Sequence, residues 1–152
     1  MPNVTFYLMN EPIANQGLAD EKSERFALAC ALTTMRFRQN QTLFLLAESQ
    51  LDAEQLDELL WQQDPDSFVP HGLSEEQTVT QAPVEIGTTQ PKRHRQVMIN
   101  LTAGISPMAN RFAQIIDFVP WNESEKQQAR ERYKQYRALG FTLETVPAPA
   151  LP

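Results

Sequence analysis

The sequence predicts a three-layer α/β fold with a mostly parallel central sheet. Short apolar runs typical of strands alternate with helical patterns along the chain. The run from Thr42 to Ala47 contains four consecutive apolar residues, which is typical of a strand buried on both faces of a parallel sheet. A chain of 152 residues with 41% hydrophobic residues suits a single core. We therefore expect one α/β domain over residues 1–146 and a Pro-rich tail over residues 147–152.

The first half of the chain predicts two strands and two helices. Val4 to Leu8 is β-branched and aromatic, as in a strand. The next helix has Asp20 or Ser23 as its expected cap and ends at Asn40. Its apolar face is marked by Phe26, Cys30, Thr33 and Phe37. After the buried run described above, the residues from Leu51 to Trp61 repeat the helical pattern. The acids of this helix are expected mostly on its solvent side: Asp52, Glu54, Asp57 and Glu58.

The second half predicts four more strands and two more helices. The strands are expected over Pro83 to Ile86, Val97 to Leu101, Ile115 to Val119 and Phe141 to Thr145. The helices are expected over Pro107 to Ala113 and Asn122 to Leu139. Asn122 is the expected cap of the last helix, with Glu125 returning the bond, and Gly140 suits a left-handed residue past its end. The segment from His71 to Pro83 is predicted to be an exposed loop, and the segment from Gln90 to Arg95 is too charged for the core.

The charge is unevenly distributed along the chain. The net charge is −6, which argues against binding of the whole surface to a phosphate backbone. Between Lys92 and Arg137, however, nine basic and four acidic residues give a net charge of +5, and the rest of the chain carries −11. An anionic partner is therefore expected to dock on that stretch alone.

Several kinds of chemistry lack their usual residues. The turn after the first strand contains one glycine, Gly17, so a phosphate-cradling loop is not predicted. His71 and His94 are the only histidines and have no second ligand at a suitable spacing, so no metal site is predicted. Cys30 is expected to be a buried, inert thiol. No serine lies in a nucleophile elbow, and we predict no catalytic residue and no cofactor.

The sequence also bears on location. No apolar segment reaches the roughly 20 residues needed to cross a bilayer, so no membrane contact is predicted. The first residues lack a basic stretch followed by a long apolar run, as a secretory leader would have. We therefore expect a cytoplasmic protein.

Two segments contain residues that packing in the core does not readily explain. Phe68 lies in a Pro-bounded loop, where an aromatic ring either fills the core or protrudes as an anchor for a partner. In the last predicted helix, one face is spaced i, i+3, i+4 and i+7 and places three cations around one aromatic ring. Its residues are Arg130, Tyr133, Lys134 and Arg137. Such a face is either simply solvated or a surface for an acidic partner.

Together these segments resemble the chi subunit of bacterial DNA polymerase III, an accessory protein of the clamp-loader complex. The resemblance covers nearly the whole chain: Thr5-Phe6-Tyr7-Leu8, Leu56-Asp57-Glu58 with Trp61, Ser67-Phe68-Val69-Pro70-His71, Pro83-Val84-Glu85-Ile86, Asp117-Phe118-Val119-Pro120, and Ala129-Arg130-Glu131-Arg132-Tyr133-Lys134 through Gly140-Phe141. Departures lie in Ser74 to Ala82, Gln90 to Gln96 and Pro147 to Pro152, and bear on edge contacts.

The resemblance implies a non-catalytic adaptor with a Rossmann-like α/β fold and two protein partners. One is the psi subunit, with which chi forms a heterodimer and which tethers it to the clamp loader. The other is the acidic C-terminal tail of single-stranded DNA-binding protein, which ends in phenylalanine, so DNA is reached only indirectly. The expected psi-binding residues are Trp61, Phe68, Val69, Pro70 and His71. The expected tail-binding residues are Val119, Arg130, Tyr133, Lys134, Arg137 and Phe141.

Two other functions remain open at this point. The basic loop from Lys92 to Arg95 would serve a protein that binds nucleic acid directly, although it has no interleaved aromatic residues on which bases could stack. His71 would serve as a general base in an enzyme of unknown type.

Overall fold

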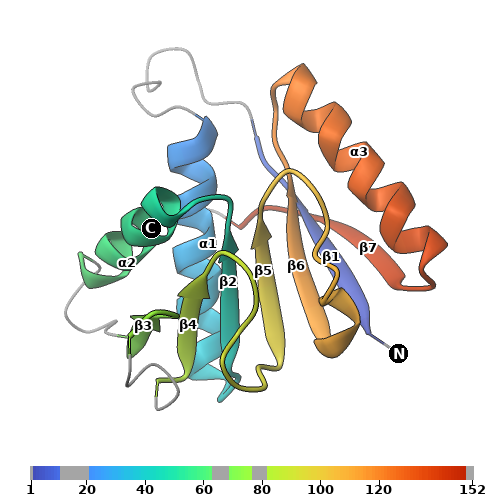
Figure 1. Ribbon diagram of the computed structural model, residues 1–152. Helices are drawn as coiled ribbons and strands as arrows, with labels where there is room; N and C mark the ends of the chain where they lie inside the picture. The colour runs from blue at the N-terminus through green and yellow to red at the C-terminus, as the bar shows by residue number, and fades with distance from the viewer. Residues whose placement is uncertain (1, 11–20, 63–68, 77–81, 150–152) are drawn as a thin grey trace, which may run out of the picture.

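The computed structural model describes residues 2–10, 21–62, 69–76 and 82–149. Within these ranges the chain forms a seven-stranded sheet in the order β3-β4-β2-β5-β6-β1-β7 (Figure 1). The strands are β1 (Asn3–Leu8), β2 (Leu43–Ala47), β3 (His71–Leu73), β4 (Val84–Gly87), β5 (Val97–Leu101), β6 (Gln114–Val119) and β7 (Thr142–Pro147). Each pair of neighbouring strands is parallel.

Helices cover both faces of this sheet (Figure 1). The first two, α1 (Glu21–Arg38) and α2 (Gln50–Trp61), share one hydrophobic core with the sheet. Helix α3 (Glu123–Ala138) packs on the opposite face with a second core, together with a short 3-10 helix, η3 (Ala109–Arg111). The three-layer α/β prediction is thus confirmed. Within the described ranges no helix has the length and apolar character needed to cross a membrane.

Strand β2 occupies the interior position that its apolar run predicts. It lies between β4 and β5, and all of its residues are buried. On one face Leu43 and Leu45 pack in the core formed with α1 and α2. On the other face Phe44 stacks on Phe112, with ring centroids 6.3 Å apart, so this part of the sheet is covered by the residues around η3 rather than by a long helix.

Three of the expected helix-end residues take the expected role. The side chain of Asn122 accepts a hydrogen bond from the Glu125 backbone N–H, and Gly140 has a φ of +90° just past α3. Asn40 has a φ of +64° where the chain leaves α1. Helix α1 includes Ser23, which therefore cannot be its cap, and Asp20 lies outside the described residues.

The predictions for the middle of the chain are wrong at strand β3 and at Asp52. The start of the expected loop forms strand β3, which pairs with β4 at the edge of the sheet; three residues are too few to show a strand period. In α2, Glu54 and Glu58 are exposed as predicted, whereas Asp52 is buried and forms an ion pair with Lys22 of α1 at 2.6 Å. The buried face of α2 is marked by Ala53, Leu56 and Leu60, while Leu51 is 76% exposed.

The prediction for the charged segment before β5 is wrong at one residue. Arg95 is fully buried and forms an ion pair with Glu85, which is also fully buried on β4. A buried cation is tolerated when its donors are satisfied by a carboxylate, and here that carboxylate comes from a strand ten residues earlier. Residue type alone therefore misplaced Arg95.

Candidate functional site

A groove runs along one face of helix α3 beside the carboxyl ends of β1 and β6. Its volume is about 530 Å³, and we refer to it as the α3 groove. It is lined by Phe6, Leu8, Val119, Lys126, Ala129, Arg130, Tyr133, Lys134 and Arg137. Leu8 and Val119 lie side by side because β1 and β6 pair in register at these residues. The groove therefore has walls from one helix and two neighbouring strands.

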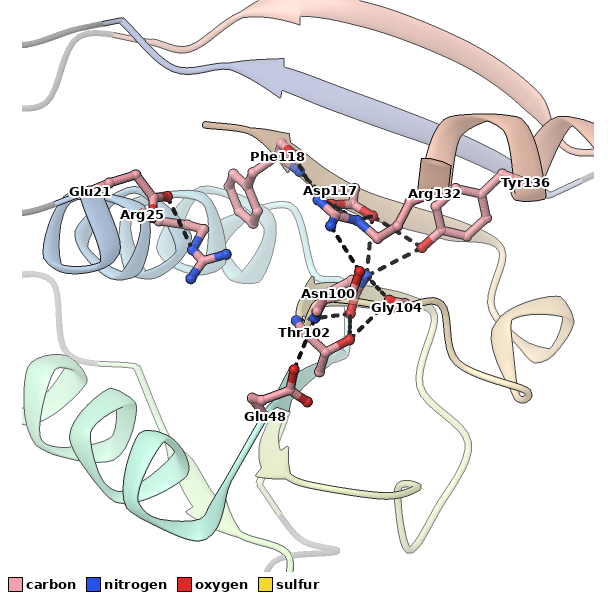
Figure 2. A network of polar contacts seen from close by, with 11 residues as sticks. Glu21, Arg25, Glu48, Asn100, Thr102, Gly104, Asp117, Phe118, Arg132 and Tyr136 are labelled. Atoms are coloured by element: carbon pink, nitrogen blue, oxygen red, sulfur yellow. Dashed lines mark hydrogen bonds and ion pairs between the residues drawn. The ribbon is translucent and has the colours of Figure 1, made fainter. Parts of the chain in front are cut away.

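The orientation of α3 is set by the residues that it buries against the sheet. Ala129, Arg132 and Tyr136 are buried at helical spacing, so the residues next to them face the groove. Asp117 of β6 is the main polar partner of this buried face (Figure 2). Arg132 donates to both of its oxygens at 3.1 and 3.2 Å, and the Tyr136 hydroxyl donates to it at 3.2 Å. Burial and the Asp117 carboxylate both raise the pKa of Tyr136, which keeps the phenol a neutral donor.

The floor of the α3 groove is aromatic and apolar. The rings of Tyr133 and Phe6 are 5.5 Å apart and tilted by 50°. Phe6 also contacts Tyr136 edge-on, so the position of the Tyr133 ring is fixed from below. At the open end, Leu8 is 42% exposed. An apolar side chain of a ligand would thus find a preformed surface on which to lie.

The rim of the groove is cationic. Lys126, Arg130, Lys134 and Arg137 all line it. Two of these cations make weak contacts within α3. Lys134 lies 3.5 Å from Glu131, with both side chains more than half exposed, and Arg130 donates a hydrogen bond to the Gln127 side-chain oxygen. Such exposed contacts exchange readily with a ligand. The groove therefore suits a short acidic peptide that also carries an apolar or aromatic residue.

The structure brings together five of the six predicted tail-binding residues. Val119, Arg130, Tyr133, Lys134 and Arg137 all line the α3 groove. Phe141 does not line it, because its ring is buried against Tyr136 with centroids 5.6 Å apart, and it borders a separate hollow with Leu139.

The sequence reasoning missed the other groove residues. Lys126 precedes Arg130 by one helical turn and could have been found from the same spacing. Phe6 and Leu8 are two residues apart on β1 and so share a face of the sheet. That this face lies next to α3 depends on the strand order, which the sequence does not show.

The predicted psi-binding residues gather at the carboxyl end of α2, with different exposures. Trp61 is 58% exposed, and Pro70 is half-buried. Val69 is fully buried, and the side chain of His71 is also buried beneath the edge of the Trp61 ring, with centroids 5.3 Å apart. Phe68 lies outside the described residues. Among the described residues of this group, Trp61 is therefore the one that offers a large apolar surface.

His71 is held on both ring nitrogens. Nδ1 lies 2.7 Å from the Val69 carbonyl oxygen, and Nε2 lies 3.1 Å from a carboxylate oxygen of Asp57. Partial burial raises the pKa of Asp57, with His71 acting in the opposite direction. A fully buried imidazole cannot touch a substrate, so this arrangement supports a structural role for His71 rather than a general base.

The comparisons with known proteins agree on one family. Residues 1–144 match the family model described as "DNA polymerase III chi subunit, HolC". The chain is 38% identical to DNA polymerase III subunit chi of Escherichia coli (strain K12) over 147 residues, which covers 95% of this chain and 97% of the relative.

Two further relatives carry the same name. The protein from Haemophilus influenzae is 42% identical over 120 residues, which covers 78% of this chain and 83% of the relative. The protein from Pseudomonas aeruginosa is 30% identical over 145 residues, with 95% of each chain covered. The chain therefore belongs to the DNA polymerase III chi subunit family.

Proposed function

We propose that this chain is a non-catalytic adaptor of the DNA polymerase III clamp-loader complex in the cytoplasm. In this role it joins the psi subunit to the acidic C-terminal tail of single-stranded DNA-binding protein during DNA replication. Family membership supports a role as a polymerase III subunit. The observation that carries the finer proposal is the α3 groove, where four cations of α3 lie beside an apolar floor.

The tail fits the α3 groove through two different forces. Its terminal phenylalanine ring would lie on Tyr133, Leu8 and Val119, where burying an aromatic side chain is worth about 2 kcal/mol. Its carboxylates would bind Arg130, Lys134 and their neighbours through charge-assisted hydrogen bonds. Salt screens these charges within about 8 Å at physiological ionic strength but does not weaken the apolar contact. Binding should therefore decline as salt rises without vanishing.

The psi subunit is proposed to dock at the carboxyl end of α2, around Trp61 and Phe68. Trp61 supplies exposed aromatic surface, which is typical of interface anchors. Val69 and His71 support this surface from beneath, since both are buried. Phe68 is proposed as a second anchor because an aromatic residue in a Pro-bounded loop can protrude toward a partner.

The two proposed surfaces lie on opposite faces of the sheet. Helix α2 packs with α1 on one face, and α3 packs on the other (Figure 1). Neither partner would therefore block the other, as an adaptor requires.

A bridging assay tests this function. The biotinylated tail peptide is immobilised, the chain is added, and retention of psi is measured with and without the chain. We expect psi to be retained only when both the chain and the last phenylalanine of the peptide are present. A matched peptide without that phenylalanine is the control. If bare single-stranded DNA of equal charge retains the chain better than the peptide does, direct nucleic-acid binding is the better account.

A further inference from the structure

A second cationic site lies at the amino edge of the sheet, away from the α3 groove. The segment before β5 and the η3 segment before β6 meet there because β5 and β6 are neighbours, with Val97 opposite Gln114. Figure 1 shows both segments at the lower edge of the sheet. They enclose a hollow of about 300 Å³, which we call the amino-edge hollow. It is lined by Pro91, Lys92, Arg93, His94, Arg95, Met108, Arg111 and Phe112, none of which lines the α3 groove.

The basic segment of this hollow is held in place by one buried carboxylate. Glu85 of β4 accepts hydrogen bonds from the Lys92 backbone N–H at 3.0 and 3.1 Å. The Arg95 guanidinium donates to it at 3.2 Å, and the Ser74 hydroxyl donates to it at 2.6 Å. Arg95 also donates to the Ala82 carbonyl oxygen. The segment is therefore anchored at both ends, and the side chains between the anchors are held at the surface.

The charge of the hollow follows from this anchoring. The negative charge of Glu85 is matched by Arg95, and both side chains are fully buried. Lys92, Arg93 and Arg111 are exposed, and among the described residues that line the hollow there is no carboxylate. Three surface cations thus converge on one concave site in a chain whose net charge is −6. A merely solvated basic loop would not need a buried anchor or a facing cation from η3.

We propose that the amino-edge hollow binds the phosphodiester backbone of single-stranded nucleic acid. A single strand is flexible enough to bring its phosphates into a hollow of this size, whereas a duplex presents them on a stiff cylinder. The ring of Phe112 is buried and stacks on Phe44, so it offers no face to a base, and His94 is the exposed ring in the lining. Recognition is therefore mainly by charge, which makes it largely independent of sequence, weak and sensitive to salt.

This inference goes beyond the proposed function, in which the chain reaches DNA only through a protein partner. The hollow and the α3 groove share no residue, so both can be occupied together. A strand held by single-stranded DNA-binding protein would then have a second, direct contact with the chain.

Fluorescence anisotropy of a labelled oligothymidylate of about 12 nucleotides tests the proposal on the full chain. Three phosphate contacts predict that log K falls against log salt with a slope of roughly −2. Between about 50 and 200 mM salt this corresponds to a loss of affinity of roughly twentyfold. A flat salt dependence would overturn the proposal.

Two double variants with the same change in net charge locate the site. Lys92→Gln with Arg111→Gln should weaken oligothymidylate binding at least tenfold at about 50 mM salt and reduce the slope to roughly −0.7. Lys134→Gln with Arg137→Gln should leave oligothymidylate binding unchanged and weaken binding of the acidic tail peptide. The first double variant should bind that peptide normally, which also shows that it is folded, since the Lys92 backbone N–H that anchors the segment is kept.

Competition with three other anionic ligands tests whether the hollow prefers single-stranded nucleic acid. An oligoglutamate of equal charge, inorganic phosphate and a duplex of the same length are each titrated as competitors. We expect all three to compete at least tenfold less well than unlabelled oligothymidylate. Equal competition by oligoglutamate would make the hollow a general anion site, and stronger competition by the duplex would contradict a single-strand site. Equal loss of DNA binding in both double variants would reduce the effect to net charge; any of these three results overturns the proposal.

Discussion

Arg132 of α3 and Asp117 of β6 form a buried ion pair that fixes the helix to the sheet. Nη2 of Arg132 lies 3.0 Å from Oδ1 of Asp117, and the two side chains are 4% and 1% exposed. The remaining donors of Arg132 reach the Ala103 and Phe118 carbonyl oxygens at 3.1 and 3.0 Å. One side chain thus joins α3, β6 and the loop after β5, and so determines which face of α3 borders the groove.

Loss of this pair should be costly. Asp117→Ala leaves the Arg132 guanidinium buried without its carboxylate, which typically costs about 3–5 kcal/mol of unfolding free energy. The matched control is Glu131→Ala, which removes an exposed partner of Lys134 and should cost about 1 kcal/mol or less. Urea unfolding of both variants measures the difference. Equal losses would mean that the buried pair does not anchor α3.

The ring of Tyr133 should matter for tail binding through its apolar contact. Tyr133→Ala removes the surface that lies on Phe6, and we expect the tail peptide to bind about tenfold more weakly, or ~1.4 kcal/mol. Tyr133→Phe keeps the ring and should bind nearly as well as wild type. Titration of the peptide against both variants separates ring from hydroxyl. A larger loss for Tyr133→Phe than for Tyr133→Ala would show that the hydroxyl, and not the ring, is the contact.

Trp61 should carry part of the affinity for psi. Truncating an aromatic anchor at the centre of an interface costs about 2 kcal/mol, or roughly thirtyfold in affinity, so Trp61→Ala should reduce co-purification of psi. Phe68→Ala is expected to act in the same direction. Leu51→Ala is the control, because Leu51 is exposed on the first turn of the same helix. If all three variants retain psi as wild type does, the docking surface lies elsewhere.

Cys30 should make the stability of the protein depend on alkaline pH. Burial raises the pKa of its thiol from 9.0 to about 12. Between these values the unfolded chain releases the proton and the folded chain keeps it, so the unfolding free energy falls as pH rises. At about pH 10 this loss should be ~1.4 kcal/mol relative to neutral pH.

The measurement compares wild type with Cys30→Ala in urea unfolding at both pH values. The variant lacks the thiol, so the stability advantage of wild type should shrink by about that amount at the higher pH. Parallel pH profiles for the two proteins would show that the thiol titrates normally in the folded state.

The order of the elements was predictable because each rests on local signals. The apolar run of β2 and the caps Asn122 and Gly140 act within a few residues, and the structure has them where the sequence indicates. Strand β3 was not predicted because it is short and forms only by pairing with its neighbour β4. The strand order could not be predicted from local signals either, because tertiary packing determines it.

Partners on other elements of the fold explain most of the remaining errors. Arg95 and Asp52 were placed at the surface by residue type, but Glu85 and Lys22 make their burial possible. The α3 residues that line the groove were predictable from helical spacing alone. Phe6 and Leu8 line the same groove only because β1 pairs with β6. Phe141 was expected in the groove from the resemblance, but its ring is buried against Tyr136 instead.

Binding of the tail of single-stranded DNA-binding protein in the α3 groove is tested most directly by isothermal titration. The tail peptide, with and without its last phenylalanine, is titrated against wild type and Lys134→Glu. We expect the complete peptide and wild type to bind most tightly, with a loss of roughly thirtyfold when the phenylalanine is removed. Lys134→Glu should cost more than Lys134→Ala, because the new carboxylate repels the acidic peptide. Equal affinities in all four combinations would contradict the claim and leave this face of α3 as a solvated surface.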